Sequence, residues 1–226
     1  MNDESFVDRY LEKRMTTYDT WLSKGLIEYS SRVIPVSESL HPEQCILPTE
    51  RALEILSNAQ SVAVQECECR SHYQRCNNPL EVCLLLDDVG DALVSKGKAR
   101  HVSLIEAAQV LKKANKWGLV HLCLYRPDHR VFALCSCCNC CCHDLQIIRL
   151  FGRQELMVHS DYRAATDPEL CTHCGECIRR CVFGARLLEG QRLVFTDNKC
   201  MGCGLCVSVC PVGIIRMVLR DEAIEE

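Results

Sequence analysis

The sequence predicts an α+β fold, in which a mostly helical N-terminal cysteine-rich domain with a small β-hairpin precedes a separate small module. Two short apolar runs at 119–125 and 131–134 flank a turn at 126–128, which is typical of a hairpin. Beyond the Asp167-Pro168 step a cysteine pattern repeats. We therefore expect a helical N-terminal segment at 1–47, a cysteine-rich, mainly helical domain at 48–160, and the repeat module at 161–226.

The helices are predicted from apolar spacing and from capping residues. Ser103 and Glu106 form a capping box, because the hydroxyl and the carboxylate can each satisfy a free amide of the first turn. The helix that they start runs to Trp117, where Gly118 can adopt the left-handed conformation. Further helices are expected at 49–60, 89–96 and 145–158, and a short extended piece at 61–64.

An amphipathic helix is also predicted near the N-terminus. It is expected to pack on the body of the protein or on a partner. Its apolar positions are Phe6, Tyr10, Leu11, Met15, Trp21 and Leu22.

Charge and hydropathy exclude several classes of protein. The net charge of −4 and the pI near 6.1 provide no basic surface for nucleic acid. No apolar run approaches the ~18 residues of a membrane span. The N-terminus is charged and lacks the apolar core of a signal peptide. We therefore expect a cytoplasmic protein, in which the 20 cysteines stay reduced and bind metal rather than form disulfides.

The repeat module contains the most specific pattern. CTHCGECIRRC and CMGCGLCVSVCP both follow the spacing C-x2-C-x2-C-x3-C. A cubane iron–sulfur cluster has four irons, and each needs one thiolate. Three cysteines of a copy share one tight loop, whereas the fourth is carried away by the following helix and ligates the other cluster. The sequence thus predicts two 4Fe–4S clusters, the first bound by Cys171, Cys174, Cys177 and Cys210, the second by Cys200, Cys203, Cys206 and Cys181.

Over about residues 165–220 this pattern resembles the bacterial two-cluster ferredoxin family. The resemblance implies a small pseudo-symmetric, dicluster ferredoxin-like α+β module with two short strand pairs and two helices. A pair of structural zinc sites is the alternative, because C-x2-C is also a zinc spacing. Zinc does not call for two copies of a triple-cysteine run, so iron–sulfur is favoured.

Two further cysteine groups lie upstream, in CECRSHYQRCNNPLEVC and CSCCNCCC. Adjacent cysteines rarely place both thiols on one ion, so the second run is expected to divide its thiols between sites. One or two additional iron–sulfur clusters are predicted, with zinc and a redox-active thiol centre as alternatives. The first group, Cys67, Cys69, Cys76 and Cys83, could supply one cluster while sharing ligands with the second, which contains Cys135, Cys137, Cys138, Cys140, Cys141 and Cys142.

The order of these segments over about residues 48–220 resembles 4Fe–4S binding proteins of anaerobic bacteria and archaea. The resemblance implies an electron-transfer role in anaerobic metabolism. The matching residues are Cys67, Cys69, Arg70, Cys76, Pro79, Cys83, 118–121 and 135–142.

Three histidines invite a comparison with Rieske-type ligation, in which histidine raises the potential of a cluster. His143 follows the six-cysteine run, His173 lies in a cluster loop, and His121 lies in an apolar strand. Because cysteines already suffice as ligands, we do not expect His143 or His173 to ligate a cluster, and His121 is expected to be a satisfied core residue.

The predicted function is that of a polyferredoxin-like electron carrier or an electron-transfer subunit. The chain lacks G-x-G-x-x-G and the phosphate-loop pattern, so it shows no nicotinamide, flavin or nucleotide site of its own. Electrons are therefore expected to come from, and go to, redox partner proteins. The protein could be a subunit of a larger complex with them. One alternative is a catalytic or activating subunit whose upstream cysteines reduce a disulfide or a partner's cofactor. Another is a metal-holding or cluster-assembly scaffold.

Overall fold

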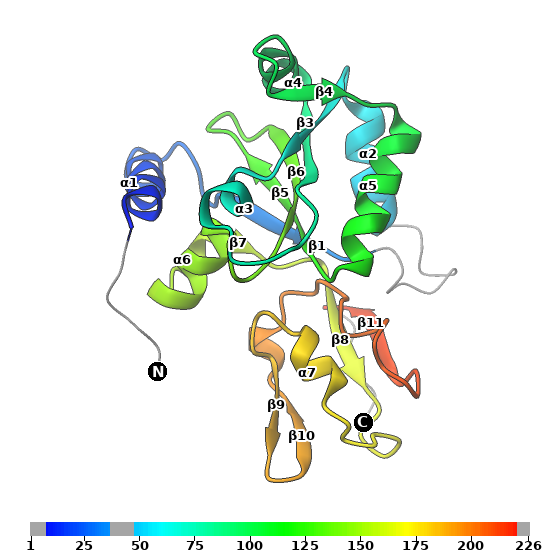
Figure 1. Ribbon diagram of the computed structural model, residues 1–226. Coiled ribbons are helices and arrows are strands. Elements are labelled where there is room, and N and C mark those ends of the chain that lie inside the picture. The colour runs from blue at the N-terminus through cyan, green and yellow to red at the C-terminus, as the bar shows by residue number, and fades with distance from the viewer. Residues whose placement is uncertain (1–7, 37–47, 221–226) are drawn as a thin grey trace.

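The computed structural model describes residues 8–36 and 48–220 (Figure 1). It is an α+β structure with one large sheet and two small ones. The large sheet has seven strands in the order β4-β2-β3-β6-β5-β1-β7, and it is mixed because β7 joins β1 in parallel whereas the other pairs are antiparallel. These strands are β1 Ser31–Ile34, β2 Val62–Glu66, β3 Glu81–Leu86, β4 Ala99–His101, β5 Val120–Tyr125, β6 Val131–Cys137 and β7 Met157–Val158.

The sequence-based expectation of a mostly helical N-terminal region is wrong, because this region forms the seven-stranded sheet. Only the β5–β6 hairpin and β2 match expected extended segments. Strand β3 is buried at every position after Glu81, and a strand covered on both faces lacks the alternation that distinguishes it from a buried helix. Strands β1, β4 and β7 have four, three and two residues, which is too short for a period to be read.

The helices predicted for the N-terminal region are found, with shifted ends. The C-terminal module has one α-helix among its described residues, not the two that the resemblance implies. Ser103 caps α5 by accepting a hydrogen bond from the Glu106 amide at 3.2 Å, and Gly118 follows the helix with a φ of +71°. The helix expected over 145–158 is shorter, since Gly152 adopts a left-handed conformation and ends it. The helices are α1 Arg9–Ser23, α2 Pro48–Asn58, α3 Glu68–Tyr73, α4 Asp87–Val94, α5 Leu104–Lys116, α6 His143–Phe151 and α7 Glu176–Arg180.

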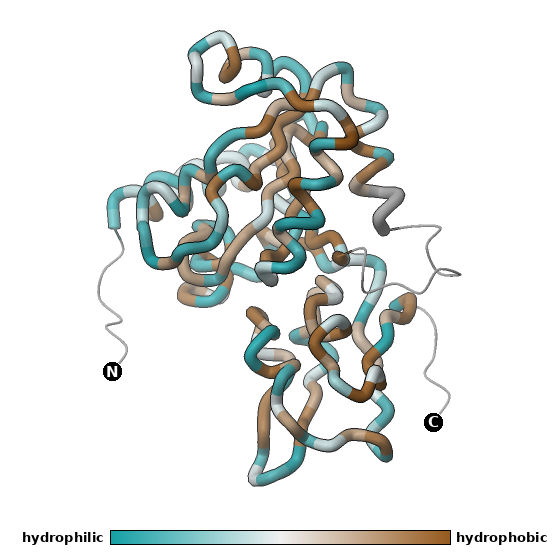
Figure 2. Tube along the Cα trace, turned by 45° about the vertical axis from the view of Figure 1, so that its right-hand side comes forward, coloured by the Kyte–Doolittle hydropathy of each residue, from teal (hydrophilic) through white to brown (hydrophobic). Residues whose placement is uncertain are grey.

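Helices cover the large sheet from two sides. Figure 1 shows α2 and α5 together on one side and α1 and α6 on the other. Leu84 of β3 and Leu134 of β6 pack with Leu56 of α2 and Leu111 of α5 in one apolar cluster. Figure 2 shows the hydrophobic residues along the central strands, as expected for a sheet enclosed in this way.

The opposite face of the sheet carries thiols. Cys83 pairs in register with Gln65 of β2 on one side and with Cys135 of β6 on the other. Register partners on neighbouring strands point to the same face, and Cys83 alternates with Leu84. The three side chains therefore form a row on the face opposite α2 and α5.

Helix α1 packs on the body of the protein. Leu11 and Tyr18 are buried, and they belong to one apolar cluster with Ile147 of α6. Of the predicted apolar positions, Phe6 lies outside the described residues.

The C-terminal module consists of two antiparallel strand pairs and one α-helix, α7, within the described residues. Met217 and Tyr162 are buried in its core together with several of its cysteines. Among the described helices, none combines the length and the apolar character needed to cross a membrane. The strands are β8 Tyr162–Thr166, β9 Arg186–Glu189, β10 Arg192–Phe195 and β11 Ile215–Leu219.

Two glycines of the module allow a test of how closely the loop at 200–206 approaches β8. Gly202 (φ +73°) and Gly213 (φ +66°) share a left-handed backbone, but a Cβ on Gly202 would meet the Tyr162 carbonyl oxygen, whereas Gly213 faces open space. Gly213→Ala should cost about 1 kcal/mol of unfolding free energy through backbone strain. Gly202→Ala should cost more than about 3 kcal/mol because backbone must also move. Urea unfolding followed by circular dichroism without oxygen measures both. Equal losses of unfolding free energy in the two variants would contradict the close approach of Gly202 to the Tyr162 carbonyl.

Candidate metal centres

The first four-cysteine set of the C-terminal module surrounds one cavity. Cys171, Cys174, Cys177 and Cys210 all line a cavity of about 20 Å³. Cys177 enters from α7, which begins after the left-handed Gly175, and Cys210 comes from the second copy of the repeat. Cys174 is exposed, so this end of the module is accessible from solvent.

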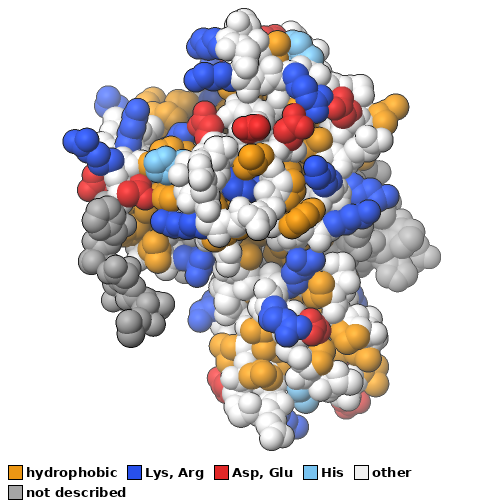
Figure 3. All heavy atoms as spheres, in the orientation of Figure 1, with side chains coloured by type: hydrophobic (Ala, Val, Ile, Leu, Met, Phe, Trp, Pro, Cys, Tyr) orange, Lys and Arg blue, Asp and Glu red, His pale blue; other side chains and the backbone are white. Residues whose placement is uncertain are grey.

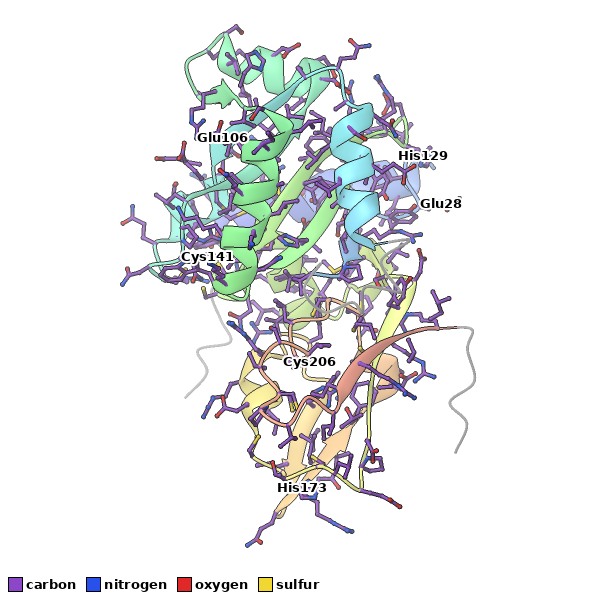
Figure 4. All side chains as sticks on the ribbon, turned by 90° about the vertical axis from the view of Figure 1, so that its right-hand side faces the viewer. Glu28, Glu106, His129, Cys141, His173 and Cys206 are labelled. Carbon is purple, nitrogen blue, oxygen red and sulfur yellow. The ribbon has the colours of Figure 1, made fainter. Side chains whose placement is uncertain are left out.

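The second set is more deeply placed. Cys200, Cys203 and Cys206 are buried, and Cys181 of the first copy lies near them. Burial, followed by the neighbouring thiols of Cys206, Cys200 and Cys181, raises the pKa of Cys203 well above its usual range. The Cys203 thiol, which burial keeps neutral, would ionise on binding metal, since metal ligation stabilises the thiolate. Figure 4 places Cys206 at the junction between the module and the N-terminal domain.

The second set also contacts the N-terminal domain. The Cys203 carbonyl accepts a hydrogen bond from the Val36 amide at 2.9 Å, and the Met201 carbonyl accepts one from Ser160 at 3.1 Å. Cys203 packs in one apolar cluster with Cys137 and Cys142. The module therefore joins the upstream cysteines through this set.

Four upstream thiols form a compact group, called here the four-thiol group: Cys76, Cys138, Cys140 and Cys141. Their sulfurs all lie within 4.8 Å of one another. The Cys76 Sγ is 3.8 Å from the Cys138 Sγ and 4.0 Å from the Cys141 Sγ, and Cys140 and Cys141 are 3.8 Å apart. Adjacent Cys140 and Cys141 thus share a site, contrary to the expectation that neighbours separate. The group could hold a metal ion.

Arg70 supports the four-thiol group from within the protein. It is only 1% exposed. Its guanidinium donates to the Cys138 Sγ at 3.5 Å, to the Ser136 carbonyl at 3.1 Å and to the Pro79 carbonyl. Although burial opposes ionisation, the hydrogen bond and the charge of Arg70 lower the pKa of Cys138 to about 7. The site therefore favours a thiolate before metal arrives.

The other upstream thiols line a second site, called here the thiol pocket. They surround a cavity of about 180 Å³, at the ends of β2, β3 and β6 and at the starts of α3 and α6. The thiols of this pocket are those of Cys67, Cys69, Cys83, Cys135, Cys137 and Cys142.

Neighbouring thiols of the pocket interact in an unbroken row. Hydrogen bonding with Cys69 and Cys83 raises the pKa of Cys67, and Cys135 does the same for Cys83. Hydrogen bonding with Cys137 and with Cys69 raises the pKa of Cys142. The row therefore runs Cys135–Cys83–Cys67–Cys69–Cys142–Cys137.

Polar side chains of α1 and α6 close the pocket. Cys69 Sγ lies 3.0 Å from His143 Nδ1 and 3.7 Å from the Tyr10 hydroxyl. The Tyr18 hydroxyl donates to Asp144 Oδ1 at 2.8 Å and lies 3.1 Å from His143 Nε2. Sequence analysis did not identify the two tyrosines or Asp144 as site residues. Tyr10 was predicted only as part of an apolar packing face, and Tyr18 was not singled out.

The structure thus divides the upstream cysteines differently from their order in the chain. Cys76 joins the second run rather than Cys67, Cys69 and Cys83. The second run is split between the two groups, as its crowding indicated.

The other two histidines have hydrogen-bonding partners. His121 is paired with Ser136 at 2.9 Å and with Asn115. His173 Nδ1 accepts from the Leu193 amide at 3.0 Å. Both contacts are structural.

Comparison with known proteins identifies the module. Residues 164–217 match the family described as "4Fe-4S dicluster domain", so a dicluster domain that implies two 4Fe–4S clusters occupies this part of the chain. The eight thiols fit such a pair, because four line one cavity and Cys181 lies beside the buried three.

The curated relatives described here match between about a fifth and a third of this chain. Hydrogenase-4 component A of Escherichia coli is 29% identical over 86 residues, which cover 36% of this chain and 42% of that protein. A subunit of the tetrathionate reductase of Archaeoglobus fulgidus is 37% identical over 54 residues, 23% of this chain and 26% of that protein.

A third relative is the arsenate respiratory reductase iron-sulfur subunit ArrB of Shewanella sp., 37% identical over 51 residues. That match covers 21% of this chain and 22% of that protein. The chain therefore spans less than half the length of each of these relatives. Their similarity supports an iron–sulfur domain like those of oxidoreductase subunits.

Arg70 provides a test of the four-thiol group. Arg70→Met should weaken metal retention and lower the unfolding free energy by about 3–5 kcal/mol, because thiolate and carbonyl groups lose a buried cationic partner. Arg70→Lys should lie between wild type and Arg70→Met, since it retains the charge but not three directed hydrogen bonds. Metal release to a chromogenic chelator and urea unfolding measure both effects.

The matched control is Arg75→Met. Arg75 is exposed and contacts the same loop, donating to the Cys140 carbonyl at 3.2 Å. Its loss should cost less than about 1 kcal/mol. Metal retention by Arg70→Met equal to that of Arg75→Met would refute the role of the buried charge.

Proposed function

We propose that this protein is an iron–sulfur electron-transfer protein, a polyferredoxin-like carrier or electron-transfer subunit, that passes single electrons between redox partner proteins. The two clusters of the dicluster domain would be held by Cys171, Cys174, Cys177 and Cys210, and by Cys200, Cys203, Cys206 and Cys181. A bound cluster supplies one-electron redox chemistry whose potential depends on its surroundings. One or two upstream centres would extend the relay.

The observation that carries the proposal is the unequal placement of the two cysteine sets. The first set reaches the surface through Cys174, whereas Cys203 of the second set packs with Cys137 and Cys142 of the N-terminal domain. Electrons can therefore be exchanged with a protein at one end of the module and with the upstream centres at the other. The relatives named as parts of a hydrogenase and of a reductase support a place in a larger assembly. We place the protein in the cytoplasm, where thiols stay reduced.

The surface beside the first set suits a protein partner. Leu170, Leu188 and Val212 are large apolar side chains that remain 62%, 47% and 48% exposed. Val212 also lines the first cavity. Figure 3 shows hydrophobic side chains gathered on the C-terminal module, whereas Lys and Arg side chains are spread over the N-terminal domain. A redox partner that docks on these residues would lie beside the first cluster.

A catalytic role for the upstream cysteines is the second candidate. It is favoured by the cavity of about 180 Å³ in the thiol pocket, which would accommodate more than metal ligands alone. In that case the dicluster domain would deliver electrons to the pocket.

Iron and acid-labile sulfide content, with EPR spectra before and after dithionite, test the electron-transfer function on protein purified without oxygen. The module alone should contribute about eight irons and eight sulfides per chain, reduced reversibly by about one electron per cluster. Zinc in place of this iron, or signals that do not return on reoxidation, would refute the proposal.

Docking at the exposed end can be tested separately. Val212→Glu should slow reduction by a dithionite-reduced two-cluster ferredoxin several-fold, because it places a charge on the apolar contact surface. Ile105→Glu is the matched control, since Ile105 is 75% exposed on α5 of the other domain. Stopped-flow absorbance measures the rates, and a redox titration of each variant separates docking from a shift in potential. Equal rates in the two variants would place docking elsewhere.

A further inference from the structure

We propose that the thiol pocket binds a polynuclear iron–sulfur cluster, whereas the four-thiol group can hold only a single metal ion. The ten cysteines of the two upstream groups would then form two centres of different kind. That electrons reach the pocket rests on the proposed function. That the pocket binds a cluster does not depend on it.

The spacing of the sulfurs separates the two groups. In a tetrahedral site with zinc–sulfur bonds of about 2.3 Å, neighbouring sulfurs lie about 3.8 Å apart. The measured separations of 3.8, 4.0 and 3.8 Å in the four-thiol group match this value. A cubane places each thiolate on a different iron, so its thiolates must lie farther apart. The four-thiol group is therefore too compact for a cubane.

The thiols of the pocket form an extended row instead of a compact group. Among the described residues, the ligand atoms of the four-thiol group lie within 4.8 Å of one another. No three described ligand atoms of the thiol pocket lie this close together. The eight thiols of the dicluster domain likewise form no compact cluster within the described residues. In this respect the pocket resembles the sites that fit four-iron clusters.

The pocket also has the required volume. Its cavity of about 180 Å³ exceeds the cavity of about 20 Å³ among the first four thiols of the dicluster domain. A centre of four irons and four sulfides needs four thiolates, and the pocket offers six. The surplus permits a larger cluster, or leaves two thiols beside a four-iron one.

Polar groups face the cavity without being saturated by the protein. Gln65 lines the cavity and its Oε1 is buried without a hydrogen-bond partner in the described structure. Because the two ends of a carboxamide exchange by rotation, the same position can direct an N–H at a cluster sulfur. Arg14 of α1 also lines the cavity and supplies positive charge against thiolates. Glu68, which pairs with Arg14 at 3.7 Å, and Asp144 also line the cavity, so the unsatisfied Gln65 amide is the group left to hydrogen-bond an occupant.

The pocket is placed next to the dicluster domain. Cys137 and Cys142 belong to the apolar cluster that contains Cys203 and Leu205 of the module. Cys76 and the rest of the four-thiol group are absent from that cluster as the structure describes it. The pocket cluster would thus follow the second cluster of the module in the relay, and the single ion would stabilise the loop at 138–141.

The first test is the composition of the wild-type protein prepared without oxygen. Sulfide and iron should each exceed the eight of the dicluster domain by about four, with one further metal ion that has no matching sulfide. About eight sulfides in protein whose ferredoxin clusters are fully reducible would overturn the inference and leave the electron-transfer function intact. This count needs no variant and so does not depend on folding.

The second test assigns the extra metal. Cys83→Ser/Cys135→Ser should lose about four irons and four sulfides together with the additional EPR signal. The matched variant Cys76→Ser/Cys140→Ser should lose one metal ion and no sulfide. The dicluster EPR signal, retained in both, verifies that the module has folded. Loss of sulfide from the Cys76/Cys140 variant instead would reverse the assignment and refute the proposal.

Discussion

The pairing of β3 with β6 is the constraint on which the upstream sites depend. It sets Cys83 opposite Cys135 and, through β2, brings Gln65 into the same row. A shift of one residue would turn Cys83 toward α2 and α5 and place Leu84 in the pocket, because strand side chains alternate between faces. The apolar cluster that contains Leu84, Leu56 and Leu111 opposes such a shift. Packing on one face of the sheet thus fixes the thiols on the other.

Local structure then decides which cysteine of the crowded run serves which site. Cys135 and Cys137 are two residues apart on β6, so both face the pocket. The strand ends at Cys137, and the following turn directs Cys138, Cys140 and Cys141 to Cys76 instead. Cys142 precedes the first turn of α6 and returns to the pocket. A strand, a turn and a helix start within eight residues therefore separate six thiols into two sets of three.

This division explains why sequence reasoning succeeded with the module and failed upstream. The C-x2-C-x2-C-x3-C repeat encodes its geometry locally, so the dicluster domain could be predicted from spacing alone. The upstream sites combine Cys76 with residues more than sixty positions later, and that association exists only through the sheet. The sheet itself was missed because β3 is buried on both faces and because β1, β4 and β7 have only four, three and two residues. Tyr10 was assigned to an ordinary packing face and Tyr18 was not singled out, and only the tertiary structure places both beside thiols.

Every group of thiols lies near an arginine, which follows from the cost of burying negative charge. Arg70 donates to Cys138 of the four-thiol group, and Arg14 lines the thiol pocket. In the module Arg186 is 3% exposed, donates to Thr166 at 2.9 Å and lies 4.7 Å from the Phe195 ring. Burial raises the pKa of both Cys177 and Cys206, one from each cluster set, and the charge of Arg186 offsets part of this rise. Reduction adds negative charge to a cluster, so a cation shared by two clusters favours the reduced state of both. Because Arg186 acts on both sets, its charge would raise the reduction potentials of both clusters rather than of one alone.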